Sequence, residues 1–208
     1  LLRRGENTAD VTVTDGWYKS GMSTHNAVYG NANGVIMQIN IHYSDGSSDT
    51  VVTDSGWKYS DGEIRYAKVY HGVTIDRNRK EKEWKPVIIP GTPLDNLIAT
   101  SNQGIINAGE YPALRYFVTP KGDKVIDFGE NLAGWEKVTL RGHKGDTVRI
   151  RHAETLDGDG ELCLSHLRTA KATNTYILSS DGEETFEPSY SYCGFRYISV
   201  EGVSGDLD

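Results

Sequence analysis

The sequence contains few cysteines and no long apolar run. Cys163 and Cys193 are the only cysteines among 208 residues, and neither belongs to a C-x-x-C pair. We therefore predict two buried free thiols rather than a disulfide framework or a zinc site. No apolar stretch approaches the roughly 20 residues that span a bilayer, and the N-terminus lacks the basic-then-apolar pattern of a signal peptide. We expect a soluble protein, without a membrane partner.

Basic surface and the common catalytic motifs are also missing. Lys and Arg number 22 against 29 Asp and Glu, which gives a formal net charge of −7. Nucleic-acid binding calls for a basic face, so we expect no nucleic-acid partner. The sequence has no G-x-S-x-G nucleophile elbow and no glycine-rich phosphate loop. Its histidines show no i, i+4 pair of the kind that binds metal.

The apolar residues that are present recur with a period of two, and no convincing amphipathic helix is found. In VIMQINIHY, alternate residues fall on one face, which predicts a half-buried strand. Those residues are Val35, Met37, Ile39, Ile41 and Tyr43. Asp45 and Gly46 follow at the place of a tight reversal, so we expect a hairpin with the next strand.

The second half shows the same alternation. KVTLRG places Leu140 inward, and DTVRIRH places Val148 and Ile150 inward. His152 continues that inward face, so we interpret it as a hydrogen-bonded core residue. Asp181-Gly182, between TNTYILSS and EETFEPS, predicts a further hairpin.

Short strands, 23 glycines and 12 tyrosines favour an all-β fold. Three prolines interrupt the chain over 85–97, which predicts a boundary there. We expect two antiparallel, jelly-roll-like β-sandwich domains over 1–90 and 104–208, joined by a linker over 91–103. The opening segment leads directly into a strand, so we expect the first sandwich to be incomplete at its N-terminus.

The stretch VIDFGENLAGW, residues 125–135, mixes acidic and aromatic side chains. Asp127 and Glu130 could supply two carboxylates, but three residues apart they need not face one another. The structural interpretation is stronger: Asn131 satisfies turn amides and Trp135 fills the core. We therefore predict no catalytic residue, and expect Asp127, Glu130, Asn131 and Trp135 to form a structural corner or a domain interface.

A second mixture of aromatic and amide side chains surrounds a glycine-rich loop. Sugar rings pack on aromatic faces and their hydroxyls bind amide and carboxyl groups. The sugar-binding hypothesis takes Trp17, Tyr18, Asn26, Tyr29 and Asn31. The alternative, which we favour, is a long surface loop with a core tryptophan. Calcium remains possible here but is not assigned, because these residues offer too few oxygens. No other cofactor is expected.

Longer stretches carry a family resemblance that covers nearly the whole chain. They are LLRRGEN, DGWY, YSDGSSDTVVTDSGWKYSDG, VIDFGENLAGWEKVTLRGHKGDTVRIRHAETLDGDGEL, LRTAKATNTYIL and GEETFEPSYSYCGFRYISVEG. In order and spacing they resemble the N-terminal β-sandwich region of bacterial α-L-rhamnosidases. The resemblance implies a glycoside hydrolase that removes terminal α-L-rhamnose with inversion. It also implies that the acid and base carboxylates lie in an (α/α) barrel, a region that this sequence does not contain.

Three hypotheses follow. In the first, the chain is the inactive β-region of an α-L-rhamnosidase, located in the bacterial cytoplasm or secreted. Its partners are then the barrel of the parent chain and a rhamnose-containing glycan. In the second, it is a free carbohydrate-binding module. In the third, it is a structural interaction sandwich.

Overall fold

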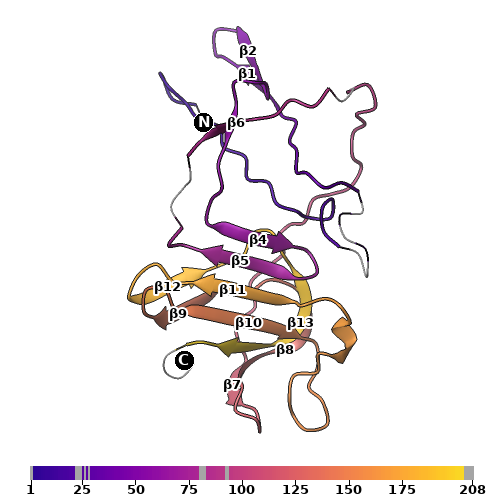
Figure 1. Ribbon diagram of the computed structural model, residues 1–208, viewed down its shortest axis with the longest axis vertical. Helices are drawn as coiled ribbons and strands as arrows, with labels where there is room; N and C mark the ends of the chain where they lie inside the picture. The colour runs from indigo at the N-terminus through magenta and orange to yellow at the C-terminus, as the bar shows by residue number, and fades with distance from the viewer. Residues whose placement is uncertain are drawn as a thin grey trace.

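The computed structural model describes residues 2–21, 25, 27, 29–79, 83–91 and 94–203. The predicted all-β class is confirmed, since a 3-10 turn at Ser165–Leu167 is the only helical element in these ranges (Figure 1). Their strands are β1 (Gln38–His42), β2 (Ser48–Val52), β3 (Lys58–Tyr59), β4 (Ile64–Lys68), β5 (Gly72–Asp76), β6 (Lys85–Pro86), β7 (Arg115–Val118), β8 (Lys124–Gly134), β9 (Val138–Gly142), β10 (Thr147–Ala153), β11 (Thr173–Ile177), β12 (Gly182–Phe186) and β13 (Cys193–Glu201).

The lower part of the molecule in Figure 1 is a β-sandwich. One layer is a seven-stranded sheet in the order β4-β5-β11-β10-β13-β8-β7, and β9 and β12 form a separate two-stranded sheet. Phe186 of β12 packs on Tyr176 of β11, with the ring centroids 4.5 Å apart. The two sheets thus enclose one apolar core between them.

Apolar and polar residues alternate along the strands, and this alternation places the apolar side chains in the core. Leu140, Val148 and Ile150 are at most 2% exposed, as their inward positions predicted. Each such side chain stabilises the fold by about 1.5–3 kcal/mol through burial. Both cysteines are free thiols, as predicted, but they are half-buried rather than buried.

The hairpin of β4 and β5 belongs to this same sheet, although it lies within residues 1–90. β5 runs parallel to β11, with Thr74 opposite Thr175. The Asn174 side chain strengthens the pairing, because its Oδ1 accepts a hydrogen bond from the Val73 amide at 2.9 Å. Backbone pairing therefore crosses the boundary expected near residue 90, and joins the two halves of the chain.

The turn at Asp181-Gly182 forms, but it does not make a hairpin. Gly182 has a positive φ of 101°. The strands on either side belong to different sheets, since β11 pairs with β10 and β5 whereas β12 pairs with β9. The predicted pairing was wrong because a tight turn also serves where a chain crosses from one layer of a sandwich to the other.

The upper part in Figure 1 consists of two small ladders, β1-β2 and β3-β6. The hairpin predicted at Asp45-Gly46 is confirmed, with Ile39 opposite Val51. All five residues of β2 are exposed. A two-stranded ladder without a second layer is only marginally stable in water.

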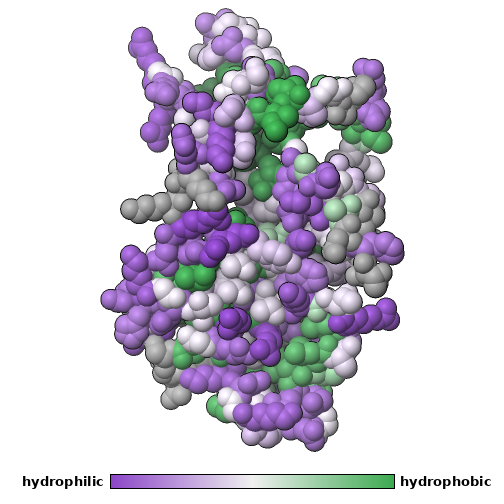
Figure 2. Space-filling view, viewed as in Figure 1, coloured by the Kyte–Doolittle hydropathy of each residue, from purple (hydrophilic) through white to green (hydrophobic). Residues whose placement is uncertain are grey.

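A long connector, residues 83–91 and 94–114, leads from β5 to β7, and its only strand is the two-residue β6 of the β3-β6 ladder. Apolar areas are visible on the upper surface in Figure 2. The large exposed apolar side chains of the connector are Trp84, Ile88, Ile89, Leu94, Leu97, Ile98, Ile105, Ile106, Tyr111 and Leu114. The accessible surface is 14678 Å², against about 9,600 Å² for a compact protein of this mass.

Candidate functional site

The FGEN stretch forms an irregularity in strand β8. Opposite β13, the register steps from Leu132 paired with Phe195 to Asp127 paired with Tyr197. Four residues of β8 therefore lie opposite one residue of β13. Gly129 allows this bulge because its φ is +87°, a conformation that other residues rarely adopt.

Asp127 anchors the bulge and is fully buried. Its Oδ1 accepts hydrogen bonds from Arg196 Nε and from the Gly129 amide, both at 2.8 Å. Its Oδ2 accepts from Arg196 Nη2 and from Arg115 Nε, both at 3.1 Å. The Arg196 hydrogen bonds lower the pKa of Asp127 to about 2, against the opposing effect of burial, with smaller contributions from Gly129 and Arg115. Asp127 is thus an ionised structural anchor.

The other residues of the motif lie elsewhere. Glu130 and Asn131 are both exposed. The turn amide at Gly129 is bound by Asp127, not by Asn131. Trp135 does not fill the core: it is half-buried, and its indole Nε1 donates to Glu187 Oε1 at 3.1 Å.

Behind the bulge, a polar network lies inside the sandwich. The Glu136 side chain is 0% exposed and accepts a hydrogen bond from His152 Nε2 at 2.9 Å. Asn174 Nδ2 donates to both Glu136 oxygens, at 2.9 and 3.0 Å, and the Tyr176 hydroxyl donates to Oε1 at 3.0 Å. The prediction that His152 is a hydrogen-bonded core residue is confirmed.

Glu136 and His152 form a buried ion pair. His152 Nδ1 lies 2.8 Å from the Ala172 carbonyl oxygen, which can only accept, so both ring nitrogens act as donors. Burial alone would raise the pKa of Glu136 and lower that of His152. The mutual attraction of the two charges outweighs burial, and so the pKa of Glu136 is lowered and that of His152 is raised. All four side chains of the network are satisfied, which gives it a structural role.

The sequence carries a signal for this network in the alternation of inward and outward positions. Counted in steps of two along the chain, Glu136 falls on the same side as Leu140 of β9, and His152 falls on the same side as Val148 and Ile150 of β10. Asn174 has the same parity as Tyr176 in β11 and as Leu178 just after it. Polar residues at inward positions of the two facing sheets indicate a buried polar cluster, provided that the strand arrangement is known.

A third buried carboxylate, that of Glu184, binds the turn at Ser179 and Ser180 between β11 and β12. Its Oε1 accepts hydrogen bonds from the Ser179 and Ser180 amides at 2.8 and 2.7 Å, and from their hydroxyls at 3.0 and 2.7 Å. Burial opposes ionisation here as well, but these bonds lower the pKa of Glu184.

These pKa shifts bear on catalysis. An inverting glycosidase needs one carboxylic acid that burial keeps protonated, and a second carboxylate about 6.5–9.5 Å away. Every carboxyl group in the described ranges whose pKa departs from its ordinary value is shifted downward. None of these four carboxyl groups is therefore a general acid of this kind.

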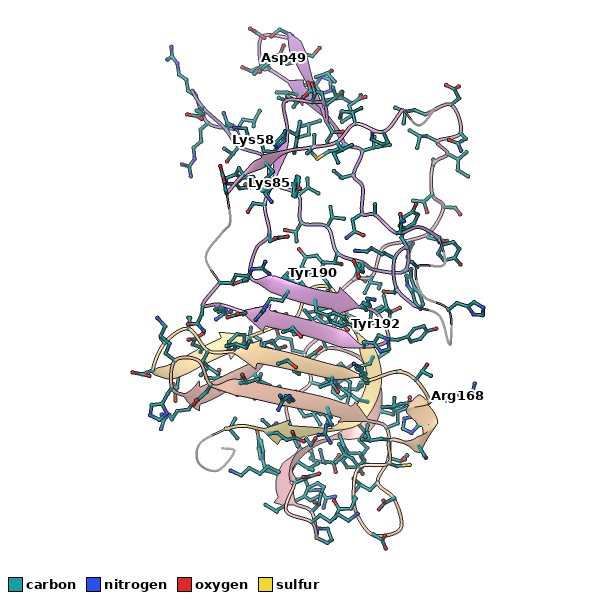
Figure 3. All side chains as sticks on the ribbon, viewed as in Figure 1. Asp49, Lys58, Lys85, Arg168, Tyr190 and Tyr192 are labelled. Atoms are coloured by element: carbon teal, nitrogen blue, oxygen red, sulfur yellow. The ribbon has the colours of Figure 1, made fainter. Side chains whose placement is uncertain are left out.

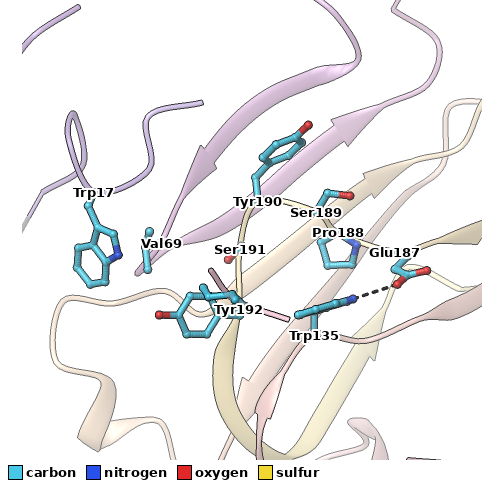
Figure 4. A pocket seen from close by; sticks show the side chains of 10 residues that line it. Trp17, Val69, Trp135, Glu187, Pro188, Ser189, Tyr190, Ser191 and Tyr192 are labelled. Atoms are coloured by element: carbon cyan, nitrogen blue, oxygen red, sulfur yellow. Dashed lines mark hydrogen bonds between the residues drawn. The ribbon is translucent and has the colours of Figure 1, made fainter. Parts of the chain in front are cut away.

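One hollow in the described residues is an open groove of about 390 Å³ between the upper and lower parts. We call it the aromatic groove. It is lined by Trp17, Val69, Ile105, Trp135, Glu187, Pro188, Ser189, Tyr190, Ser191 and Tyr192 (Figure 4). Tyr190 and Tyr192 lie near β4 and β5, where the two parts meet (Figure 3).

Local sequence explains the shape of the groove wall. β12 ends at Phe186, before Pro188, which has no amide hydrogen with which to continue the ladder. The loop that follows therefore leaves the two-stranded sheet and leads to β13 in the seven-stranded sheet. It places Tyr190 and Tyr192 in the lining of the same groove as Trp135, which comes directly after β8 (Figure 4).

The five residues of the sugar-binding hypothesis do not form one site. Trp17 lines the aromatic groove and packs edge-on against Tyr70, with centroids 5.2 Å apart. Tyr18 lines a second hollow, with Asn33. Tyr29 and Asn31 are exposed and line neither hollow, and Asn26 lies outside the described residues.

The described residues contain no group of three or more His, Cys, Asp or Glu side chains that could hold a metal ion. Asp15, the acidic group beside the predicted sugar site, binds Lys19 Nζ at 3.2 Å and lies 3.8 Å from Lys68 Nζ. In the same ranges, no helix is long and apolar enough to cross a membrane.

Comparison with known proteins identifies the family. Residues 1–103 match the model of the α-L-rhamnosidase N-terminal domain. Residues 118–208 match the bacterial α-L-rhamnosidase concanavalin-like domain. An α-L-rhamnosidase of Streptomyces avermitilis is 32% identical over 98% of this chain, which spans 21% of that relative.

Solved structures of α-L-rhamnosidases are also similar to this chain. The native α-L-rhamnosidase of Aspergillus terreus superposes with a TM-score of 0.85 at 31% identity, over 93% of this chain and 24% of its own. The Streptomyces avermitilis α-L-rhamnosidase complexed with L-rhamnose gives a TM-score of 0.85 at 31% identity, over 92% of this chain and 20% of its own. The chain belongs to the α-L-rhamnosidase family, and it corresponds to a non-catalytic, N-terminal β-region of these much longer proteins.

Proposed function

We propose that this chain supports the catalytic domain of an inverting α-L-rhamnosidase that releases terminal α-L-rhamnose from glycans or glycosides. The chain itself performs no hydrolysis. Its lower sandwich is a rigid platform, and its upper part and connector provide the surface on which the catalytic (α/α) barrel rests.

The exposed connector carries this proposal. Ile98 is 91% exposed, Ile88 87% and Ile106 78%. Large apolar side chains in such numbers mark a surface that another protein covers, because water is a poor environment for them. Covering each 100 Å² of apolar surface contributes about 2.5 kcal/mol. The barrel that the family resemblance implies is the occupant we propose.

A chimera tests the proposal. The corresponding β-region of the Streptomyces avermitilis relative is replaced by this chain, and hydrolysis of a chromogenic α-L-rhamnoside is measured. We expect the chimera to be active, the isolated chain to be inactive, and the relative without its β-region to lose both thermal stability and activity.

Two results would contradict the proposal. One is turnover of the rhamnoside by the isolated chain. The other is a chimera that is no more stable or active than the truncated relative. A chain that binds sugar but leaves the chimera inactive favours a free carbohydrate-binding module, and a chain that does neither favours a structural interaction sandwich.

A further inference from the structure

Asn33 and Gly34 form the only Asn-Gly pair in the sequence. They precede strand β1, and both residues are exposed. Both also line the second hollow, together with Tyr18 and with Pro90 of the connector. Water therefore reaches the side chain of Asn33 and the backbone that follows it.

An asparagine that is followed by glycine is able to change its own covalent structure without an enzyme. The backbone nitrogen of Gly34 attacks Cγ of Asn33 and gives up its proton to solvent. The bond between Cγ and Nδ2 breaks, and the leaving nitrogen takes up a proton from water and departs as ammonia. Water then opens the resulting succinimide ring, to aspartate or to isoaspartate. Either product replaces a neutral amide by a carboxylate, so the formal net charge of −7 falls by one.

The surroundings of Gly34 favour this attack. A Cβ atom at Gly34 would meet nothing within 4 Å, and glycine itself has no side chain, so the approach to its nitrogen is open. Among the described residues, the Gly34 amide has no hydrogen-bond acceptor that would hold it away from Asn33. Asn31 provides a comparison within the same loop. It is also exposed, but the Cβ atom of Ala32 crowds the nitrogen that would attack it.

The side chain of Asn33 is bound by Asp15. Asn33 Nδ2 donates a hydrogen bond to Asp15 Oδ1 at 3.3 Å, which is long for such a bond. The same carboxylate binds Lys19 Nζ at 3.2 Å and lies 3.8 Å from Lys68 Nζ of β4. Asp15 therefore connects the loop before β1 to the lower sheet. Because the bond to Asn33 is long and exposed, water competes for it, and it restrains the Asn33 amide only weakly.

Deamidation removes the contact between Asn33 and Asp15. A carboxylate at residue 33 has no hydrogen to donate, and it would face the carboxylate of Asp15. Like charges at this separation repel each other. Asp15 then keeps Lys19 and Lys68 as partners but loses the loop. Segment 15–19, which contains Trp17, is the part of the chain next to this change.

We propose that Asn33 is a site of spontaneous deamidation, and that the carboxylate formed there releases the loop at residues 31–34 from Asp15. The reaction needs only water, so it is a property of the chain itself. It changes the upper part of the molecule as the protein ages, whereas the sequence of the lower sandwich contains no Asn-Gly pair. The proposal does not rest on the proposed function, because neither the catalytic domain nor a glycan takes part.

Peptide mapping by mass spectrometry tests the site on the whole 208-residue chain. The folded protein is incubated in mildly alkaline buffer at physiological temperature, and samples are taken over several weeks. We expect a mass gain of about one dalton at Asn33, divided between aspartate and isoaspartate. The rate at Asn33 should exceed that at Asn31 at least about tenfold, because only Asn33 is followed by glycine.

Gly34→Ala is the matched variant. Open space surrounds Gly34 and its φ is not positive, so an added methyl group is compatible with the fold. The variant keeps Asn33 and its bond to Asp15, and it should deamidate at least about tenfold more slowly. Thermal melts verify that both proteins are folded. Equal rates in the two proteins, or a rate at Asn33 no higher than that at Asn31, would overturn the site.

Hydrogen exchange tests the release of the loop. Asn33→Asp carries the carboxylate of the product from the start, and Asn31→Asp adds the same charge to a side chain that does not bind Asp15. The Lys19 amide donates to the Asp15 carbonyl oxygen at 2.9 Å. We expect this amide to exchange at least about threefold faster in Asn33→Asp than in Asn31→Asp. Equal exchange in the two variants would contradict the release, even where the mass gain at Asn33 is found.

Discussion

The lower and upper parts of the molecule use apolar residues in opposite ways. Ile150 in the lower sandwich is 0% exposed, whereas Ile98 in the connector is 91% exposed. In the sandwich, apolar and polar residues alternate along the strands, and the two sheets enclose one apolar core. In the described residues of the upper part, the same alternation gives two-stranded ladders without a second sheet packed on them. The sequence pattern therefore specifies strands in both parts, but it specifies a self-sufficient fold only in the lower one.

The largest effect should come from breaking the buried ion pair. Glu136→Ala leaves the charge of His152 without its partner inside the core. We expect a loss of about 3–5 kcal/mol in the free energy of unfolding. Urea denaturation followed by circular dichroism measures it. Lys137→Ala, at the exposed neighbouring position, should change stability by less than about 0.5 kcal/mol.

A pair of isoleucine substitutions tests the comparison directly. Ile150→Ala should cost about 2–5 kcal/mol, because it opens a cavity in the core. Ile98→Ala should change the stability of the isolated chain by less than about 0.5 kcal/mol, because the exposed Ile98 side chain buries little apolar surface there. The same denaturation experiment serves both variants. Comparable losses at the two positions would show that the connector is packed in solution.

Acid should weaken the lower sandwich through Asp127. The pKa of Asp127 is lowered from its ordinary value of 3.8 to about 2 in the folded chain. Its stabilising contribution is therefore present above about pH 4 and is lost as the pH falls toward 2, by about 2 kcal/mol. Denaturation at a series of pH values measures this loss. In Asp127→Asn the corresponding part of the pH dependence should disappear.

A smaller effect is expected at the β8 bulge. Gly129→Ala forces a side chain into a positive φ and brings its Cβ to 3.1 Å from Leu114. We expect a loss of about 1–2 kcal/mol. Gly134→Ala is the control, since open space surrounds that position and its φ is not positive. Thermal denaturation distinguishes the two, and equal melting temperatures would contradict a strained bulge.

Local signals in the sequence predicted the local features. Periodicity predicts the inward positions of Leu140, Val148 and Ile150 and the all-β class of the described residues. Turn chemistry predicts the hairpin at Asp45-Gly46. The sequence predicted a structural corner at the DFGEN stretch, and the structure has a bulge within β8 there, at Gly129. The anchor of this bulge was not predicted, because Arg196 lies 69 residues away from Asp127.

Features that depend on distant contacts escaped prediction for the same reason. Val73 and Asn174 are 101 residues apart and still share a hydrogen bond, which makes the β4-β5 hairpin part of the lower sheet. The aromatic groove also needs Trp17 and Tyr192 in one place. Periodicity identifies the face on which a residue lies but not the strand that becomes its neighbour.

Hydrogen exchange on the isolated chain and on the active chimera tests most directly whether the upper part is completed by the catalytic domain. We expect β10 and β13 to be strongly protected in both proteins. The amides of β1, β2 and the connector should exchange rapidly in the isolated chain, and at least about a hundredfold more slowly in the chimera. Equal protection of these segments in the two proteins would contradict a platform that the catalytic domain covers.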